Sequence, residues 1–266
     1  METMRIATWN INSVRLRLPI VLRFLAEYDP DVLCLQETKS PNEFFPSDAI
    51  AEAGYAHQAI NGMKGYNGVA ILSKHELSDT GIHHWVKKDD SRHIAATLPN
   101  GTTIHNLYVP AGGDEPDPEK NDKFDHKLKF VKEMKGWFKK NADNAGKLVL
   151  VGDLNIAPSE HDVWSHKQLL KIVSHTPVET DGLNAAKDAF GWVDAVRHLS
   201  PDPEKIYSWW SYRSKNWELA DKGRRLDHIW VTPPLAPGLS NLQVVKDARG
   251  WEKPSDHVPV IVDLAD

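Results

Sequence analysis

The sequence predicts an α/β fold, a four-layered α/β sandwich in which two mixed β-sheets pack face to face with helices outside. Three observations support this prediction. Short apolar runs of strand length recur along the chain. Helical patterns lie among them without the strict alternation of a parallel barrel, and both halves share an outline of strands, a crossover helix and more strands. Because the chain has no internal repeat, low-complexity tract or rich linker, we expect a single domain over residues 1–266.

The first 110 residues are predicted to form strands, with helices between the early ones. The strand-like runs cover residues 5–10, 31–37, 55–60, 68–73, 93–98 and 103–109. Helical patterns cover residues 16–28 and 48–53.

The second half begins with a loop and a long helix. The Pro-, Asp- and Glu-rich stretch 111–122 indicates one surface loop. In residues 123–140 the apolar positions have the spacing of a buried helical stripe, at Phe124, Leu128, Val131, Met134 and Phe138. The all-apolar run 147–151 predicts a strand in the middle of a sheet. Further strands are expected at residues 206–212, 226–232, 242–246 and 258–263.

Composition and the start of the chain favour a cytoplasmic protein that makes no membrane span. No apolar run approaches the roughly 18–20 residues that a span requires. The opening METMRIATWN passes directly into a strand pattern and lacks the features of a secretory signal. The one cysteine, Cys34, lies in an apolar run and is expected to be a small buried residue.

The formal net charge of −5 argues mildly against a nucleic-acid partner, but the distribution of charge matters more than its sum. Residues 212–225 contain five basic residues against two acidic ones, with four aromatic residues in or beside the stretch. This pattern is typical of a surface that binds phosphates and bases, and a solvated loop is the ordinary alternative. The basic residues are Arg213, Lys215, Lys222, Arg224 and Arg225, and the aromatic residues are Trp209, Trp210, Tyr212 and Trp217.

Polar side chains recur at the ends of the predicted strands, and most are carboxylates, amides or histidine. They are Asn10, Asn12, Glu37, Lys39, Tyr108, Asp153, Asn155, Asp227, Asp256 and His257. Several of these residues could have a purely structural role. Asp153 could form a turn or a helix cap, Asn10 could form a strand-end turn, and Tyr108 could be a half-buried aromatic residue. Asp227 is harder to explain in this way, because a charge inside an apolar strand costs several kcal/mol unless it is paired or bound to metal.

This set of residues fits the hydrolysis of a phosphodiester. The phosphate is anionic and repels nucleophiles, so a hard cation such as Mg²⁺, which prefers Glu, Asp and Asn oxygens, must neutralise developing charge. A carboxylate must orient water, and a histidine or cation must stabilise the phosphorane oxygens. The sequence has no zinc-type Cys/His spacing, Gly-x-Ser-x-Gly elbow, phosphate-binding loop motif or Rossmann fingerprint, which argues against acyl hydrolases, kinases and dehydrogenases.

Seven motifs stand out by their order and spacing, namely WNIN, LQETK, YNGVAILSK, YVPAGG, GDLNIAP, RRLDHIWV and PSDHVPV. Together they resemble the endonuclease/exonuclease/phosphatase superfamily, and most closely its exonuclease III group of abasic-site endonucleases. The resemblance runs from residue 5 to residue 264. It implies cleavage of double-stranded DNA on the 5′ side of abasic sites, with 3′→5′ exonuclease and 3′-phosphatase or phosphodiesterase activity at blocked 3′ ends. It also implies a monomer that depends on Mg²⁺, for which Mn²⁺ can substitute.

The resemblance further implies which residues hold the metal. Glu37 would be the principal ligand, and Lys39 would lie near the metal. Asn10 would position the phosphate or a metal-bound water. The implied ligand set is Glu37, Asn10, Asp153, Asn155 and Asp256.

The remaining strand-end residues are implied to act on the reacting groups. Asp153 would orient or deprotonate the attacking water, and Asn155 would hold the scissile phosphate. His257 would contact a phosphate oxygen while Asp227 holds its other ring nitrogen, an arrangement that fixes the tautomer and favours the charged ring. Tyr108 would hydrogen-bond the phosphate, and tyrosine here resembles the abasic endonucleases, because pancreatic deoxyribonuclease-like members have histidine.

The segment YSWWSYRSK resembles the part of the abasic group that supplies an aromatic wall for a base-free sugar. Trp209 would form this wall, with Trp210 beside it and Leu226 opposite. Arg224 would contact phosphate or insert beside the gap in the DNA stack.

The chain departs from the family pattern at three positions. Asn12 stands where some relatives have a metal-binding aspartate, which lowers the charge available to a second metal. Ala111 stands where an amide residue often contacts phosphate, and Arg224 stands where human-type enzymes have a pocket tryptophan.

Two other classes of function remain open. One is another hydrolase: a general deoxyribonuclease, or a phosphatase or phosphodiesterase acting on a small or lipid phosphate. An aromatic-poor substrate face would have favoured the phosphatase. The other is a catalytically silent DNA-binding module. Loss of Glu37, Asp153 or His257 would have supported the silent module, and all three are present.

Overall fold

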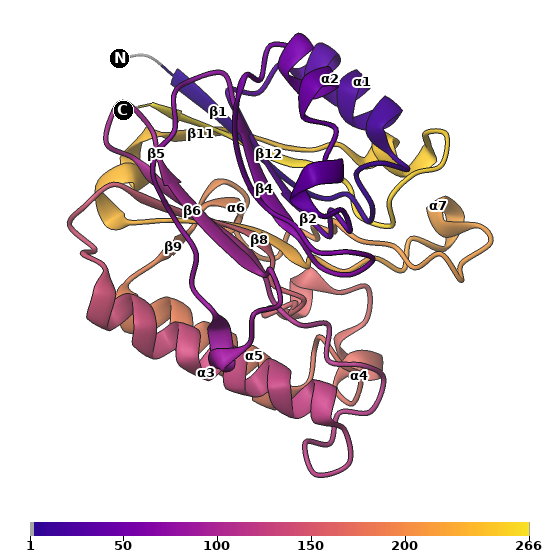
Figure 1. The fold of residues 1–266 in the computed structure, drawn as a ribbon. Coiled ribbons are helices and arrows are strands. Elements are labelled where there is room, and N and C mark those ends of the chain that lie inside the picture. Colours follow the sequence, from indigo (N-terminus) through magenta and orange to yellow (C-terminus); the bar gives the residue numbers. More distant parts are fainter. Residues whose placement is uncertain (1–2, 266) are drawn as a thin grey trace.

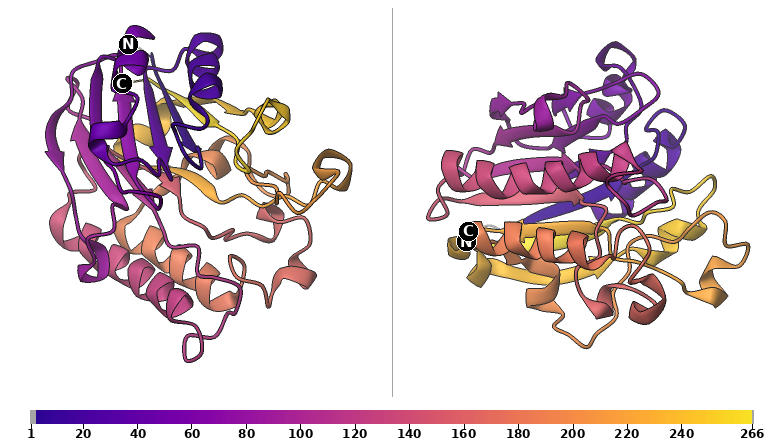
Figure 2. Two further views of the ribbon diagram at one scale, coloured as in Figure 1. Left: turned by 45° about the vertical axis from the view of Figure 1, so that its right-hand side comes forward. Right: turned by 90° about the horizontal axis from the view of Figure 1, so that it is seen from below.

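The computed structural model describes residues 3–265 and arranges them in four layers (Figure 1). Two six-stranded sheets form the inner layers. Helices α1 (Leu18–Tyr28) and α2 (Ser47–Glu52) cover the outer face of the first sheet, while α3 (Asp122–Asn141) and α5 (Pro177–Phe190) lie side by side on the second (Figure 2). The predicted α/β sandwich is confirmed.

The first sheet has the strand order β11-β12-β1-β2-β4-β3. Strands β1 and β2 are parallel, and the other neighbouring strands are antiparallel. The bounds are β1 Thr3–Asn10, β2 Val32–Gln36, β3 His57–Asn61, β4 Val69–Ser73, β11 Leu239–Val244 and β12 Val260–Ala265.

The second sheet has the strand order β5-β6-β7-β8-β10-β9 and likewise contains one parallel pair, β7 with β8. Tyr108 at the end of β7 is in register with Asp153 at the end of β8, and Asp153 is in register with Asp227 at the start of antiparallel β10. The bounds are β5 Ser78–Gly81, β6 His93–Thr97, β7 Thr103–Tyr108, β8 Leu148–Asp153, β9 Val193–Asp194 and β10 Asp227–Val231.

The core between the sheets is made by inward-facing residues of both. Strand β2 illustrates the alternation, because Val32 and Cys34 face the other sheet while Leu33 and Leu35 pack under α1. The burial predicted for Cys34 is confirmed. Near the strand ends, the Gln36 amide donates to Asn106 Oδ1 over 2.8 Å and links the two sheets through a buried hydrogen bond.

Short elements complete the fold. The remaining helices are α4 His166–Leu169, α6 Ala195–Leu199 and α7 Trp217–Ala220. Short 3₁₀ helices occupy Asn42–Phe44, Trp85–Lys87, Glu160–Asp162, Pro233–Gly238 and Lys246–Gly250. Among the helices within residues 3–265, none is both long and apolar enough to cross a membrane.

Several features differ from the sequence prediction. The short strands β5 and β9 and the short helices α4, α6 and α7 were not predicted. Residues 206–212 were expected to be a strand, and this prediction is wrong: the segment is a loop whose Trp209 forms isolated bridges with Arg224 and His257. Helix α5 was not predicted, although Pro177 begins it and Gly191 ends it with a left-handed φ of 81°. The other predicted elements are present, with ends shifted by a few residues.

Candidate active site

The strand topology brings the strand-end polar residues to one edge of the sandwich. Parallel β1 and β2 end at Asn10 and Gln36, directly before Glu37, and parallel β7 and β8 end at Tyr108 and Asp153. Antiparallel β10 begins at the same edge with Asp227. The segment that leads into β12 supplies Asp256 and His257 there, because β12 runs antiparallel to β1.

The backbone at this edge adopts uncommon conformations. Glu37 has a φ of 50° and Asn155 a φ of 54°, both in the left-handed region that few residues other than glycine occupy. Such conformations cost energy and persist where the surroundings fix them, and they concentrate at functional sites.

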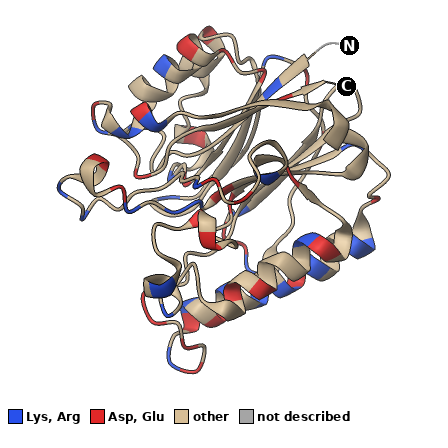
Figure 3. Ribbon diagram, turned by 180° about the vertical axis from the view of Figure 1, so that it is seen from behind, with Lys and Arg blue, Asp and Glu red and all other residues tan. Residues whose placement is uncertain are grey.

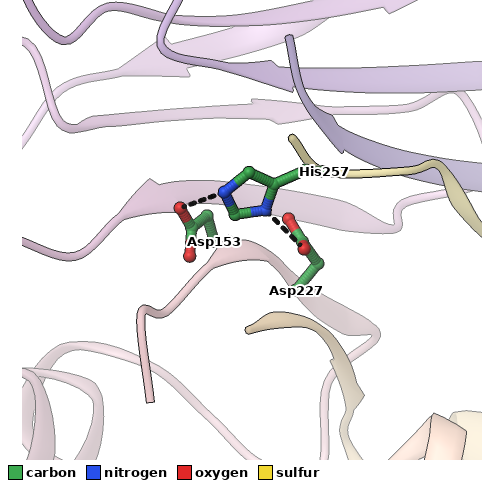
Figure 4. Close-up of side chains that lie close together, drawn as sticks. All are labelled: Asp153, Asp227 and His257. Atoms are coloured by element: carbon green, nitrogen blue, oxygen red, sulfur yellow. Dashed lines mark hydrogen bonds and ion pairs between the residues drawn. The ribbon is translucent and has the colours of Figure 1, made fainter. Parts of the chain in front are cut away.

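His257 lies between two carboxylates, as Figure 4 shows. Its Nδ1 is 2.8 Å from Asp227 Oδ2, and its Nε2 is 3.6 Å from Asp153 Oδ2. The three side chains are almost fully buried, at 4%, 0% and 1% exposure for His257, Asp227 and Asp153. The indole of Trp9 donates to the backbone oxygen of His257 over 3.0 Å, which helps to hold the ring in place.

Burial and the neighbouring charges set the ionisation of this group. Burial disfavours the charged imidazole, but the carboxylates of Asp227 and Asp153 outweigh it and raise the pKa of His257 to about 10. Burial, together with the negative charges of Asp227 and Glu37, raises the pKa of Asp153 to about 7 against the opposing effect of His257. A cation bound nearby would lower the pKa of Asp153. With such a cation bound, the favoured state is an imidazolium beside a carboxylate.

Two amides connect the acidic residues. The amide nitrogen of Asn10 lies 2.9 Å from Glu37 Oε1 and 2.9 Å from Asp153 Oδ2. The Asn155 side chain donates to Asp153 Oδ2 over 3.1 Å and to the Val109 carbonyl over 2.9 Å. Asn10, Asn155, Glu37 and Asp153 thus form one hydrogen-bonded cluster.

A second chain of contacts leads from Glu37 to Asp256. The Lys39 ammonium lies 2.8 Å from Glu37 Oε2 and 2.6 Å from Asn12 Oδ1. The Asn12 amide donates to Asp256 Oδ1 over 3.2 Å. Burial works against ionisation of Glu37, but Lys39 and hydrogen bonds from Asn10 and Tyr108 outweigh it and lower its pKa.

These residues fit a hard divalent cation. Glu37, Asp153 and Asp256 supply carboxylate oxygens and Asn12 supplies an amide oxygen, the donor types that Mg²⁺ prefers. The position of the Lys39 ammonium between Glu37 and Asn12 indicates a place where positive charge is stabilised. Asp153, Asp227 and His257 also have metal-site spacing, with one donor atom from each within 4.8 Å. In that trio His257 is better suited to donate a hydrogen bond than to bind a metal ion, because a protonated imidazole has no lone pair to offer a metal.

Tyr108 contacts Glu37, and the guanidinium of Arg92 lies over its ring. Burial and the negative charges of Glu37 and Asp153 raise the pKa of Tyr108 well above its ordinary value, so the phenol keeps its proton. The Arg92 guanidinium lies 4.8 Å from the Tyr108 ring centre and donates to the Tyr108 carbonyl over 3.2 Å. Arg92 was not singled out in the sequence.

An open cleft of about 780 Å³ lies over this cluster. Glu37, Tyr108, Asn155, Asp256 and His257 line one part of it. The part that extends away from them is lined by Trp164, Val173, Ser174, Trp209, Arg224 and Leu226, among others.

The predicted pocket residues meet in this cleft. The Trp209 indole donates to Asp256 Oδ2 over 2.9 Å, which joins the aromatic wall to the acidic site. Leu226 packs in the same small apolar cluster as Trp209. Trp210 also borders the cleft, but it is only 2% exposed and belongs mainly to the core under the first sheet.

The adjacent residues Arg224 and Arg225 are held by specific contacts and do not belong to a solvated basic loop. Arg224 lies over the Trp209 ring at 5.2 Å and donates through Nη1 to Val173 O and Ser174 Oγ, so it forms part of the cleft wall. Arg225 is 1% exposed and paired with Asp162, so its inclusion in a nucleic-acid surface was wrong.

Sequence reasoning also missed a buried lysine beneath the cleft, Lys127. It occupies the inward face of α3 together with Phe124, Phe130 and Val131. Its position three residues after Phe124, the first residue of the apolar stripe, was the signal in the sequence that could have indicated its burial.

The family model described as "Endonuclease/Exonuclease/phosphatase family" matches residues 7–257. The chain is 32% identical over 268 residues to exodeoxyribonuclease III of Haemophilus influenzae, covering 97% of this chain and 98% of that protein. It is also 32% identical over 272 residues to the DNA repair nuclease APEX1 of Danio rerio, covering 98% of this chain and 82% of that protein.

Two solved structures are similar over nearly the whole fold. An AP endonuclease from Archaeoglobus fulgidus matches with a TM-score of 0.91 and 36% identity, covering 97% of this chain and 98% of that one. The 3′ phosphatase NExo from Neisseria, bound to a product DNA hairpin, matches with a TM-score of 0.90 and 33% identity, covering 99% and 100% of the two chains.

Proposed function

Because this chain belongs to the Endonuclease/Exonuclease/phosphatase family, we propose that it is a DNA repair hydrolase that cleaves the phosphodiester on the 5′ side of abasic sites in duplex DNA. Its relatives include exodeoxyribonuclease III and an AP endonuclease, and NExo is named as a 3′ phosphatase and 3′–5′ exonuclease. We therefore include 3′→5′ exonuclease and 3′-phosphatase or phosphodiesterase activity in the proposal.

The observation that carries the proposal is the opposition of Asp153 and His257, in which His257 lines the cleft and Asp153 lies 3.6 Å from it. Asp153, with an elevated pKa, is suited to orient a water and accept its proton as the water attacks phosphorus. His257, charged and held by Asp227, is suited to donate from Nε2 to a phosphate oxygen on which charge develops. Asn155 and Tyr108 would hold the other oxygens while the bond to the leaving sugar oxygen breaks.

We propose Mg²⁺ as the cofactor, with Mn²⁺ as a substitute. Glu37 would be its principal ligand, Asp256 would help, and Asn10, Asp153 and Asn155 would complete the oxygen set. When bound, the cation would neutralise charge that develops on the phosphate. Lys39, now paired with Glu37, would remain beside it.

Selection of abasic sites is proposed to depend on the apolar part of the cleft. A sugar without a base can leave the stack and enter a small pocket that a normal nucleotide cannot enter. Trp209 and Leu226 supply the wall of such a pocket, and Arg224 covers the Trp209 ring. The anchored guanidinium favours a wall contact over insertion into the DNA.

We also propose that residues 1–266 form one domain and that the protein acts as a monomer in the cytoplasm. The uninterrupted family match over residues 7–257 supports the single domain.

One assay separates the candidate substrates. The protein with Mg²⁺ would be incubated with an abasic duplex, an intact duplex, a duplex with a 3′-phosphate and inositol phosphates. We expect incision of the abasic duplex and release of the 3′-phosphate. Cleavage of inositol phosphates alone would favour a small-phosphate phosphatase, and equal nicking of intact and abasic duplexes would favour a general deoxyribonuclease.

A further inference from the structure

A fully buried lysine of α3 lies beneath the cleft. Lys127 is 0% exposed, and its ammonium contacts three acceptors from different parts of the chain. It donates to the Asn155 carbonyl over 2.7 Å and to the Ala111 carbonyl over 3.2 Å, and it lies 2.5 Å from Glu179 Oε1. An ammonium group has three protons, so all of them are used.

Its partner Glu179 binds the segment of residues 174–176, which lies beside the cleft. This carboxylate accepts from the Ser174 backbone nitrogen over 2.9 Å, from the Thr176 backbone nitrogen over 3.2 Å and from the Thr176 hydroxyl over 2.6 Å. The neighbouring Val173 carbonyl and Ser174 hydroxyl anchor Arg224. The ion pair therefore connects α3 and α5 to both the phosphate side and the pocket side of the cleft.

The lysine stem also supports the turn after β7. Gly112 has a φ of 90°, and a Cβ there would lie 2.9 Å from Lys127 Cδ and 3.1 Å from Val173 Cγ1. Asn155 is likewise left-handed, with a φ of 54°. Glycine adopts a positive φ at no steric cost, whereas Asn155 does so at some cost, so the hydrogen bond from Lys127 to the Asn155 carbonyl helps to hold that conformation.

Global stability does not explain why such a pair is buried. Removing two charges from water is costly, and apolar residues of similar volume often replace a buried ion pair without loss of stability. A methionine could occupy the same space among Phe124, Phe130 and Val131 on this face of α3. What an apolar residue could not supply is the pair of donors to Asn155 and Ala111.

We propose that Lys127, oriented by Glu179, is a positioning residue that fixes the Asn155 backbone and the turn at residues 111–113 against the scissile phosphate. This inference rests on the proposed function, because it takes the phosphate to lie at Asn155. Lys127 acts through the backbone and touches no substrate.

The first test separates positioning from packing by kinetics. Lys127→Met keeps the volume and removes the donors, and Lys127→Arg keeps the charge. Val131→Ala is the matched control, because it removes buried packing from the same helix and Val131 is not among the residues that line the cleft. We expect Lys127→Met to lower kcat about tenfold to a hundredfold, since displacement of a reacting group by an ångström has an effect of this size. KM and the melting temperature should change less, and Lys127→Arg should recover most of the lost kcat.

Val131→Ala is expected to lower the melting temperature and leave kcat near that of the unmodified protein. A Lys127→Met protein that is folded and matches Val131→Ala in kcat would overturn the proposal. If Lys127→Met does not fold, the decision passes to Glu179→Gln, which removes the charge that orients Lys127: an unchanged kcat in this variant would equally overturn the proposal.

The second test uses hydrogen exchange and needs no activity. Lys127→Met should speed exchange of amides in residues 109–114 and 153–157 and leave β2 unchanged. Uniform exchange changes, or none, would contradict the positioning role. An unmodified protein that cleaves neither abasic nor 3′-phosphorylated DNA would refute the proposed function, and the exchange result would still decide whether Lys127 positions these segments.

Discussion

The chemistry proposed for the site requires opposite charges on two buried residues, Asp153 and His257. Asp153 must be ionised to accept a proton while His257 is charged to meet the phosphate oxygen, and each favours the state of the other across 3.6 Å. Both act on charge that develops during the reaction, so both should contribute to kcat more than to DNA binding.

Asp153→Asn is expected to reduce kcat by several orders of magnitude, because an amide cannot accept the proton. DNA affinity should stay near normal or rise, since a negative charge near the phosphate is removed. Asp227→Asn should have a milder effect, because it weakens the orientation of His257 without removing the ring. Single-turnover cleavage and binding to uncleaved DNA would be measured for both. Normal cleavage by Asp153→Asn would mean that another group orients the water.

Glu37→Ala is expected to abolish most activity through loss of cation binding. Calorimetric titration with Mn²⁺ and Mg²⁺ should show weakened binding, and excess metal should restore part of the rate. Glu43→Ala is a matched control, because Glu43 is an exposed carboxylate of the following 3₁₀ turn. Full activity of the unmodified protein in excess chelator would contradict the proposed dependence on a divalent cation.

Trp209→Ala should lower kcat/KM for the abasic duplex about tenfold to a hundredfold, because an aromatic contact to nucleic acid is worth roughly 1–3 kcal/mol. Removal of a terminal 3′-phosphate needs less of the pocket and should suffer less. Trp209→Phe keeps a ring but removes the hydrogen bond to Asp256, so it separates the wall from the acidic site. Equal losses on both substrates for Trp209→Ala would indicate a general role in folding or binding.

At the scale of elements, hydrophobic patterns predicted the strands of both sheets except β5 and β9, because buried strands such as β2 and β4 leave apolar runs. Strand β5 is exposed throughout and β9 has two residues, so neither leaves such a run. The same signal failed for residues 206–212, where apolar and aromatic residues line a cleft and pair with the site instead of a sheet. Helix α5 was missed because its buried face includes Glu179 and Ala186 beside Leu183 and Phe190, although its capping residues were present. The roles of Lys127 and Arg92 could not be assigned, because the carbonyls of Asn155 and Tyr108 to which they donate are brought near only by the fold.

Buried histidines of the second sheet should make the protein sensitive to acid. Burial lowers the pKa of His105 on β7 to about 4 and, with Arg225 nearby, lowers the pKa of His228 on β10 to about 4. Unfolded histidine titrates near pH 6.5, so between about 6.5 and 4 the unfolded chain binds more protons and folding stability falls as pH falls.

When the pH falls from 7 to 5, His105 and His228 should each reduce the free energy of unfolding by about 1–2 kcal/mol. Urea titrations at the two pH values would measure the change. His105→Gln should reduce the loss, and His198→Gln, which alters an exposed histidine on α6, should not. An equal acid-induced loss in all three proteins would assign the sensitivity to other groups.

At the scale of the whole molecule, an acidic protein must bind a polyanion through a restricted basic surface. Figure 3 shows lysine and arginine on both sides of the projecting helix α7, and the exposed residues there include Arg213, Lys215 and Lys222. Arg213 and Lys222 also line the cleft. The helix α3 carries interspersed charges of both signs, as in Figure 3, and lies on the outer face of the second sheet.

This distribution predicts how salt affects binding. Each phosphate contact contributes roughly −0.9 to the slope of log K against log salt for duplex DNA. Arg213→Ala combined with Lys222→Ala should therefore make the slope shallower by about 2 and weaken binding to abasic and intact duplexes alike. Lys139→Ala combined with Lys140→Ala removes the same charge from the last turn of α3 and should leave the slope unchanged. Equal changes for the two double variants would mean that net charge alone governs binding, and the segment around α7 would then not be the DNA-binding surface.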